Sequence, residues 1–295
     1  MRRRAVIQPS LTHTVSMLRI GAVSYLNTKP LIRGLADRLG SRGRLTLDLP
    51  SRLAEDLRRG DLDVALIPSI EYFRAPREHY EVVSDAVIAC RGPVWSVRLL
   101  SRVPVPQIRR LALDEGSRTS AAMARILLAE MYGLQPELSA LPIDESPQQC
   151  DADAVLLIGD RAMHPPRGTY AEIWDLGDRW CRWTELPFVF AMWVARRGVA
   201  SDHLIDVLQH SRDDGLAHLE SIASCEAAGH GLTKEDLHRY FAENLHFRLG
   251  PGERTGLDAF RTRAARLGLI VAASTDPSPI DPPPARNFVN EEFFE

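Results

Sequence analysis

The sequence predicts an α/β protein of two lobes, each a mostly parallel sheet flanked by helices, with a ligand cleft between the lobes. Strand-like and helix-like segments alternate twice, first over residues 18–68 and again over residues 108–158. A third observation is the apolar and aromatic run 188–194, which suits a strand that returns to the first unit. With 295 residues, the chain is long enough for two units that each bury a core.

The first unit begins with the buried strand-like run 18–23, which leads into a polar turn. Pro30 fits the first helical position after this turn. Residues 45–49 alternate between apolar and polar as a second strand does, and Ser51 is expected to cap the helix that follows. The continuous apolar run 64–67 is typical of a central parallel strand. This order of segments predicts a parallel sheet covered by helices.

The second unit repeats this order. Residues 108–113 form its first predicted strand, and a helix follows that Ser117 or Thr119 caps. Residues 138–143 and 154–158 are predicted to be the next two strands. Most of the chain after the returning strand is expected to be helical.

Two α/β units joined by two strand crossovers describe a type II periplasmic-binding-protein-like fold. We expect lobe 1 to comprise residues 18–97 and 188–272, and lobe 2 to comprise residues 98–187. Residues 1–17 are expected to form an N-terminal extension. The prolines within residues 273–295 exclude regular structure and predict a Pro-rich C-terminal tail.

The composition is that of a globular protein, with 45% hydrophobic and 25% charged residues. The formal net charge of −3 favours neither nucleic acid nor an anionic membrane as a partner. No stretch reaches the roughly 18 apolar residues of a membrane-spanning helix, and the basic start of the chain lacks the apolar core of a signal peptide. We therefore expect a cytoplasmic protein that acts on a small molecule; the sequence leaves its oligomeric state open.

Four cysteines are scattered without a CxxC pair, and no histidine stands at metal-ligand spacing. Spacing does not exclude disulfides, but reduced thiols are the simpler interpretation. There is also no GxGxxG motif after a strand, no Walker A loop, no GxSxG and no HExxH motif. We expect neither a cofactor nor a metal site.

Polar groups are expected at the cleft, because ligands of such folds bind where strand ends and helix N-termini meet. Ser117, Thr119 and Ser120 stand at the start of a helix, whose free N–H groups and dipole favour an anion. The plainer interpretation is that one of the three caps the helix while the others are solvated.

Similar alternatives apply to the other polar residues of these turns. Asn27 and Ser69 can simply cap helices, and Asp160 can bind ligand or bond to nearby backbone. A hydroxyl within an apolar segment, such as that of Ser96, needs a partner when it is buried. The candidate site residues are therefore Ser24, Asn27, Ser69, Ser96, Ser117, Thr119, Ser120 and Asp160.

At these same turns the sequence resembles the chorismate dehydratase family of the futalosine route to menaquinone. The similarity is carried by six segments that follow one another in the order of the family. They are GAVSYLNTKPL (21–31), ALIPSIEYFR (65–74), GPVWSVRLLS (92–101), DEGSRTSAAMARILL (114–128), LIGDRAM (157–163) and WDLGDRWCRWTELPFVFAMWVAR (174–196).

The resemblance implies the two-lobed fold reached above, and the removal of water from chorismate to give 3-[(1-carboxyvinyl)oxy]benzoate. It also implies a substrate-assisted mechanism without a cofactor, in which the enolpyruvyl carboxylate of chorismate takes the ring proton. The asparagine of the family matches Asn27, which would orient that carboxylate or the departing hydroxyl. Ser69, Ser96, Thr119 and Ser120 match positions expected to hold the two carboxylates.

Three other functions fit parts of the sequence. A sister family on this fold acts on a later futalosine-pathway intermediate and carries a His-Glu pair where Gly159 and Asp160 stand here. A solute-binding protein for a small anionic ligand would share the fold and the hydroxyl-rich cleft. The effector domain of a regulator would need a helix-turn-helix segment, which does not precede the first strand.

Overall fold

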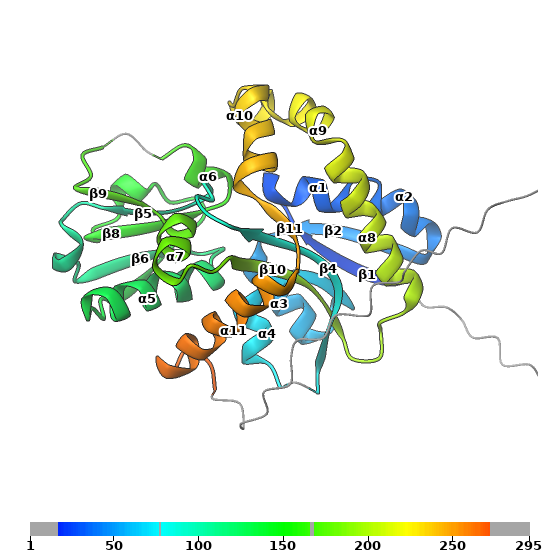
Figure 1. The fold of residues 1–295 in the computed structure, drawn as a ribbon, viewed down its shortest axis with the longest axis horizontal. Coiled ribbons are helices and arrows are strands. Elements are labelled where there is room, and N and C mark those ends of the chain that lie inside the picture. The colour runs from blue at the N-terminus through cyan, green and yellow to red at the C-terminus, as the bar shows by residue number, and fades with distance from the viewer. Residues whose placement is uncertain (1–16, 77, 166–167, 272–295) are drawn as a thin grey trace, which may run out of the picture.

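The structure is a computed structural model that describes residues 17–76, 78–165 and 168–271. Its two sheets, each with helices on its faces, form two lobes that lie side by side (Figure 1). One sheet has the strand order β11-β4-β10-β3-β1-β2 and the other has the order β7-β6-β8-β5-β9. The predicted two-lobed α/β fold is confirmed.

The strands of the six-stranded sheet are β1 (Leu18–Val23), β2 (Gly43–Asp48), β3 (Val64–Pro68), β4 (Tyr80–Cys90), β10 (Phe188–Arg196) and β11 (His246–Arg248). The five-stranded sheet comprises β5 (Val97–Ser101), β6 (Arg110–Asp114), β7 (Glu137–Leu141), β8 (Ala154–Ile158) and β9 (Glu172–Asp175).

Eight α-helices of the described residues accompany the six-stranded sheet: α1 (Lys29–Ile32), α2 (Leu35–Leu39), α3 (Pro50–Arg59), α4 (Ser69–Arg74), α8 (Asp202–Ala217), α9 (Leu219–Glu226), α10 (Lys234–Arg239) and α11 (Pro251–Arg266). The other sheet carries α5 (Thr119–Tyr132), α6 (Asp160–Met163) and α7 (Leu176–Thr184). Three short segments matter for the site: the 3-10 turns η1 (Leu26–Thr28) and η5 (Ala228–His230), and the π-helix η6 (Tyr240–Asn244).

Both sheets are mixed, whereas the sequence predicts mostly parallel sheets. β1 pairs in parallel with β2 and β3, and β6 pairs in parallel with β7 and β8. β4 and β10, the strands next to the two crossovers, run antiparallel to their neighbours. The chain leaves the first sheet through residues 91–96 and returns through residues 185–187. Because β1, β3, β6 and β8 end toward the gap between the lobes, the turns that follow them meet there.

Two predicted helices differ in detail from those of the structure. Leu49 is the N-cap of α3 and Pro50 occupies its first turn, so Ser51 lies within the helix and is buried. Proline is well suited to this position, since the N–H that it lacks would have no intrahelical acceptor. The helix expected after the first strand is also broken, because Gly34 adopts a left-handed conformation with φ of 63° between α1 and α2.

The proposed limits of the two lobes remain predictions. Residues 1–16 of the expected N-terminal extension lie outside the described residues, as does the tail 273–295. Among the residues that the structure describes, no helix has both the length and the apolar character needed to cross a membrane.

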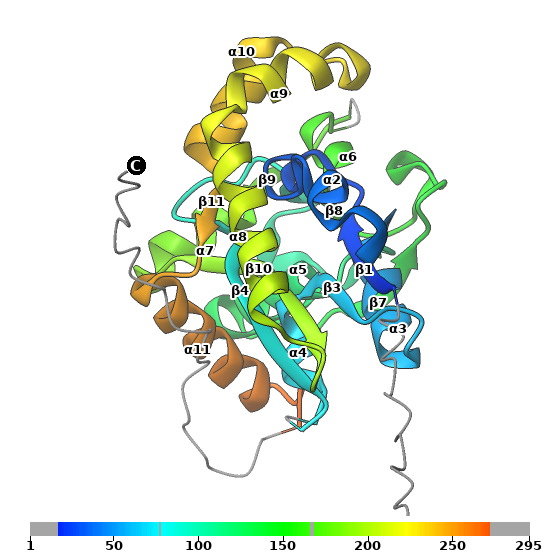
Figure 2. The ribbon, with the colours of Figure 1, turned by 90° about the vertical axis from the view of Figure 1, so that its right-hand side faces the viewer.

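Helix α8 packs directly on the backbone of α1, the helix that follows the first polar turn (Figure 2). A Cβ atom on Gly215 would stand 1.8 Å from the carbonyl oxygen of Pro30. Backbone cannot move aside as a flexible side chain can, so only glycine permits this approach. The position of α1, and with it the end of the preceding turn, depends on this contact.

We expect Gly215→Ala to lower the free energy of unfolding by about 1–3 kcal/mol or more, the usual cost of overpacking. Urea denaturation of the purified proteins measures this change. Gly229→Ala is the matched control, since a Cβ atom there would meet nothing within 4 Å. An unchanged stability of Gly215→Ala would contradict the close packing of α8 on α1.

Candidate active site

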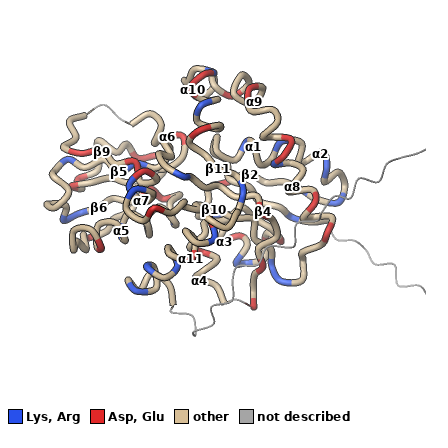
Figure 3. The backbone as a smooth tube through the Cα atoms, in the orientation of Figure 1, with Lys and Arg blue, Asp and Glu red and all other residues tan. Residues whose placement is uncertain are grey.

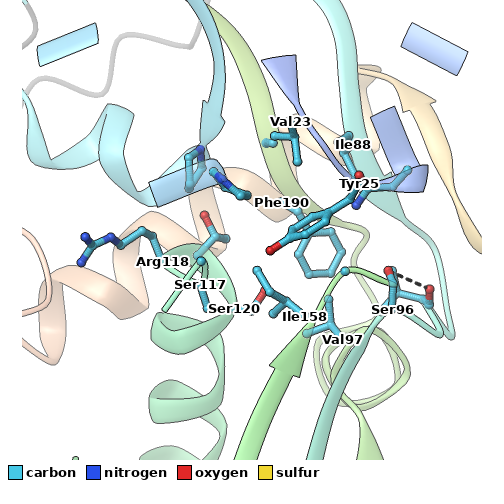
Figure 4. Close-up of a pocket in the computed structure, with 18 residues that line it drawn as sticks. Val23, Tyr25, Ile88, Ser96, Val97, Ser117, Arg118, Ser120, Ile158 and Phe190 are labelled. Atoms are coloured by element: carbon cyan, nitrogen blue, oxygen red, sulfur yellow. Dashed lines mark hydrogen bonds between the residues drawn. The ribbon is translucent and has the colours of Figure 1, made fainter. Parts of the chain in front are cut away.

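A partly open cavity lies between the two lobes. Its walls combine apolar side chains with hydroxyls and one amide (Figure 4). The residues that line the cavity are Val23, Tyr25, Asn27, Pro50, Pro68, Ile88, Val94, Ser96, Val97, Gly116, Ser117, Arg118, Thr119, Ser120, Ile158, Gly159, Phe190 and Ala191.

The turn after β1 brings Asn27 to the cavity. Asn27 is half-buried within η1, and the hydroxyl of Thr28 donates a hydrogen bond of 3.3 Å to its Oδ1 atom. The N-cap of η1 is Tyr25 and that of α1 is Thr28, and neither helix start has a side-chain cap. Asn27 is therefore not a helix cap, and it lines the cavity. Ser24, one of the predicted binding residues, is exposed and does not line the cavity.

Tyr25 is a lining residue that sequence reasoning did not single out. Its ring lies against the second lobe, because a Cβ atom on Gly159 would stand 2.7 Å from a ring carbon. The hydroxyl is buried and has no hydrogen-bond partner among the described residues. Burial raises the pKa of Tyr25 above its ordinary value, and the nearby carboxylates of Asp114 and Asp160 act in the same direction.

Asp160, predicted as a binding residue, contacts the other lobe instead of lining the cavity. Its Oδ1 atom accepts a hydrogen bond of 3.0 Å from the backbone N–H of Leu26. Its Oδ2 atom lies 3.5 Å from Nε2 of His230 in η5. Burial raises the pKa of Asp160, while the Leu26 N–H and the positive charges of His230 and Lys29 oppose that rise. Asp160 thus fixes the turn that carries Asn27.

Ser96 lies in the first crossover, and its buried hydroxyl has the hydrogen-bond partner that was expected. The hydroxyl of Tyr240 donates a hydrogen bond of 2.8 Å to its Oγ atom. Tyr240 is 1% exposed and belongs to the π-helix η6, a kind of segment that is frequent at functional sites. Burial raises the pKa of Tyr240, and hydrogen bonds to Ser96 and Asn27 oppose that rise. Tyr240 therefore ties the first crossover to the C-terminal part of the chain.

A strained turn sets the position of Ser96. The N–H of Ser96 donates to the carbonyl of Val94 at 2.7 Å, so Trp95 between them has a φ of 63°, rare for a side chain of its size. The Asp175 carboxylate holds this turn by accepting the N–H groups of Val94 and Trp95 at 3.0 and 2.6 Å. Backbone strain of this kind persists where the surroundings enforce it, and it concentrates at functional sites.

Thr119 and Ser69 meet across the lobes at the base of the cavity. Their hydroxyl oxygens are 3.3 Å apart, and Thr119 also accepts the backbone N–H of Ile70 at 3.3 Å. The Ser69 hydroxyl donates to the carbonyl of Val189 at 2.8 Å. Ser69 is fully buried and does not line the cavity, so it supports Thr119 in this structure rather than facing a ligand.

The N-terminus of α5 opens onto the cavity. Its N-cap is Arg118, and the Ser117 hydroxyl accepts the N–H of Ala121 at 3.0 Å, so Ser117 provides the side-chain capping. Thr119 is the first helical residue and not the cap. The hydroxyl of Ser120 has no hydrogen-bond partner among the described residues. Because the first N–H groups of a helix lack intrahelical acceptors, this end suits an anion. Arg118 is the charged residue among those that line the cavity.

The structure thus brings together Asn27, Ser96, Ser117, Thr119 and Ser120 in one cavity, and leaves Ser24, Ser69 and Asp160 outside its lining. No group of three or more His, Cys, Asp or Glu side chains in the described part of the chain could hold a metal ion. Tyr25 could have been noticed from its place in the turn before Asn27. Tyr240 could not, because 144 residues separate it from Ser96 and no local pattern marks it.

Comparisons with known proteins agree on one family. The model of the menaquinone biosynthesis family matches residues 18–266. A chorismate dehydratase from Thermus thermophilus is 32% identical over 271 residues, which covers 86% of this chain and 96% of that protein.

Solved structures with lower identity share the fold. A protein from Archaeoglobus fulgidus has a TM-score of 0.72 at 15% identity and is matched over 88% of this chain and all of its own. The periplasmic aliphatic sulphonate binding protein SsuA from Escherichia coli has a TM-score of 0.58 at 16% identity, with 86% and 88% of the two chains covered. The fold is thus that of periplasmic binding proteins, and the sequence places the chain more closely: it belongs to the menaquinone biosynthesis family and is a relative of chorismate dehydratase.

Proposed function

We propose that this protein is a chorismate dehydratase, a hydro-lyase of menaquinone biosynthesis that converts chorismate to 3-[(1-carboxyvinyl)oxy]benzoate and water. The observation that carries the proposal is the meeting of one amide, several hydroxyls and a helix N-terminus in a cavity with apolar walls. The relationship to a chorismate dehydratase over most of both chains supports the same activity. The proposed partner is therefore a small-molecule substrate.

The chemical groups of chorismate match the cavity. Its six-membered ring suits the apolar walls formed by Val23, Ile88, Ile158 and Phe190. Its two carboxylates need hydrogen-bond donors, which the hydroxyls and the N-terminus of α5 supply. Arg118 is exposed, and Figure 4 shows its guanidinium directed away from the other lining side chains, so we assign it no role toward the carboxylates. We assign Ser96, Thr119 and Ser120 to the carboxylates, with Ser69 supporting Thr119 from behind.

The reaction requires few catalytic groups from the protein, because the product gains an aromatic ring. A ring carbon loses its proton, the electron pair of that bond completes an aromatic ring, and the neighbouring carbon–oxygen bond breaks. The hydroxyl leaves with a proton as water, so the atoms balance without an oxidant or a cofactor. We propose that the enolpyruvyl carboxylate of the substrate takes the ring proton. The role of Asn27 is then to orient that carboxylate or the departing hydroxyl, since an amide can donate to one and accept from the other.

We further propose that the reaction takes place in the cytoplasm. All four cysteines of the sequence are free thiols in the structure, as is usual in a reducing compartment. Menaquinone synthesis from chorismate also requires the enzyme to meet a dianionic metabolite, which does not cross membranes unaided.

The direct test is to incubate the purified protein with chorismate and follow the formation of an aromatic product by absorbance and mass. We expect stoichiometric 3-[(1-carboxyvinyl)oxy]benzoate, with a mass lower than chorismate by one water. Tight binding of chorismate without turnover would contradict the proposal and favour a solute-binding protein. Failure both to bind and to convert chorismate would exclude it as the substrate.

Asn27→Asp nearly preserves the shape of the side chain but places a carboxylate beside a dianionic substrate. We expect turnover to fall by about 100-fold or more, the usual cost of removing one preorganised donor. The midpoint of thermal unfolding should change little, because Asn27 caps no helix. Steady-state kinetics and calorimetry measure the two effects. Near wild-type turnover in Asn27→Asp would remove Asn27 from the mechanism.

The hydroxyls of Ser120 and Thr119 should respond differently to removal. Ser120→Ala is expected to weaken chorismate binding by about 1–3 kcal/mol, the range for hydrogen bonds to charged groups. Its stability should change by less than about 1 kcal/mol. Thr119→Ala should lower both binding and stability, because Thr119 also accepts the N–H of Ile70.

Titration calorimetry with chorismate and urea denaturation separate these outcomes. Ser24→Ala is the matched control, since Ser24 is exposed and does not line the cavity. Equal affinities in Ser24→Ala and Ser120→Ala would show that the N-terminus of α5 does not hold the substrate.

A further inference from the structure

Tyr25 presents a buried hydroxyl to the cavity without a hydrogen-bond partner among the described residues. The residue is 8% exposed, so its hydroxyl lies away from the outer surface of the protein. Figure 4 shows the ring extending across the cavity, with the hydroxyl directed toward Ser117 and Ser120 at the start of α5. The hydroxyl and the helix N-terminus therefore converge on the same part of the cavity.

The fold gains nothing from this hydroxyl. A buried polar group without a partner costs free energy, whereas a phenylalanine ring would fill the same space without that cost. The nearby hydroxyls of Ser96, Ser117 and Thr119 all accept a hydrogen bond from within the protein. The Tyr25 hydroxyl differs from them in that it has no hydrogen-bond partner among the described residues.

Two glycines of the second lobe hold the ring in place. A Cβ atom on Gly116 would stand 2.8 Å from the Tyr25 hydroxyl oxygen, and one on Gly159 would stand 2.7 Å from the ring. Gly159 also has a φ of 63° and a ψ of −148°, a conformation that is essentially restricted to glycine. The ring thus packs against backbone without side chains, and this packing fixes the position of the hydroxyl in the unliganded protein.

The hydroxyl is a donor and not an anion. Burial raises the pKa of Tyr25, and the carboxylates of Asp114 and Asp160 raise it further. The carboxylate of Asp114 accepts the N–H of Gly116 at 3.1 Å through its Oδ1 atom, while its Oδ2 atom has no hydrogen-bond partner among the described residues. Its Oδ2 atom lies 3.4 Å from the guanidinium of Arg161. A protonated phenol in this position suits an acceptor on the ligand, as does the adjacent end of α5.

We propose that Tyr25 is a substrate-binding residue, whose hydroxyl donates a hydrogen bond to the substrate carboxylate that the N-terminus of α5 also binds. The inference rests on the proposed function, and it adds a donor from the first lobe to those of the second. Because Tyr25 and Ser120 belong to different lobes, the carboxylate would connect the two lobes.

The test is Tyr25→Phe, which removes the hydroxyl and keeps the ring. For chorismate we expect KM to rise and kcat/KM to fall by about 10- to 100-fold, the equivalent of one hydrogen bond to a charged group. The unliganded protein should unfold at the same temperature as the wild type or at a higher one, since the orphaned hydroxyl is gone. A hydroxyl with a merely structural role would lower the unfolding temperature and leave KM unchanged.

Tyr132→Phe is the matched control, because this variant removes a phenolic hydroxyl from a residue that is 37% exposed and lies outside the cavity lining. Wild-type KM in Tyr25→Phe, measured with an active wild-type enzyme, would overturn the inference and leave the proposed function intact. Absence of turnover in the wild type itself would overturn the proposed function, and the inference with it.

Discussion

One oxygen of the Asp160 carboxylate accepts the backbone N–H of Leu26 across the boundary between the lobes, and much of the site follows from that contact. It joins the turn after β8 to the turn after β1, and the Tyr25 ring packs on Gly159 beside it. Asn27 is the next residue along the first turn. The turn that carries the amide is thus held by a hydrogen bond to the other lobe.

The first crossover, residues 91–96, forms another part of the cavity wall and is held by hydrogen bonds to Asp175. Asp175, at the end of β9, binds two N–H groups of the crossover and keeps Trp95 in a rare backbone conformation. This conformation directs Ser96 toward Tyr240, whose π-helix arrives from the C-terminal part of the chain. Figure 3 shows charged residues spread over the helices and loops of both lobes. The polar groups of the cavity itself are hydroxyls, one amide and a helix N-terminus.

Much of this arrangement could be predicted from the sequence, and there is a physical reason why the remaining contacts could not be predicted. The strands β3 and β8 follow from unbroken apolar runs, and the end of α5 follows from Gly133, which adopts a left-handed conformation. The turns after the predicted strands led to Asn27, Thr119 and Ser120 because strand ends converge in such folds. Local patterns carry no information on pairs distant in sequence.

For that reason the partner of Asp160, the burial of Ser69 and the bond from Tyr240 to Ser96 were not foreseen. The choice between a cap and a ligand contact was equally open for Ser117, whose hydroxyl turned out to cap α5. Whether a polar side chain at a strand end faces the ligand or the opposite lobe depends on how the lobes dock.

The central claim is that chorismate binds between the lobes with its reacting groups beside Asn27. A crystal structure of the Asn27→Asp variant soaked with chorismate tests it most directly. We predict substrate in the cavity, with the enolpyruvyl carboxylate or the ring hydroxyl within about 2.7–3.2 Å of the side chain of residue 27. Chorismate bound outside the cavity, or a side chain of residue 27 turned away from it, would contradict the account.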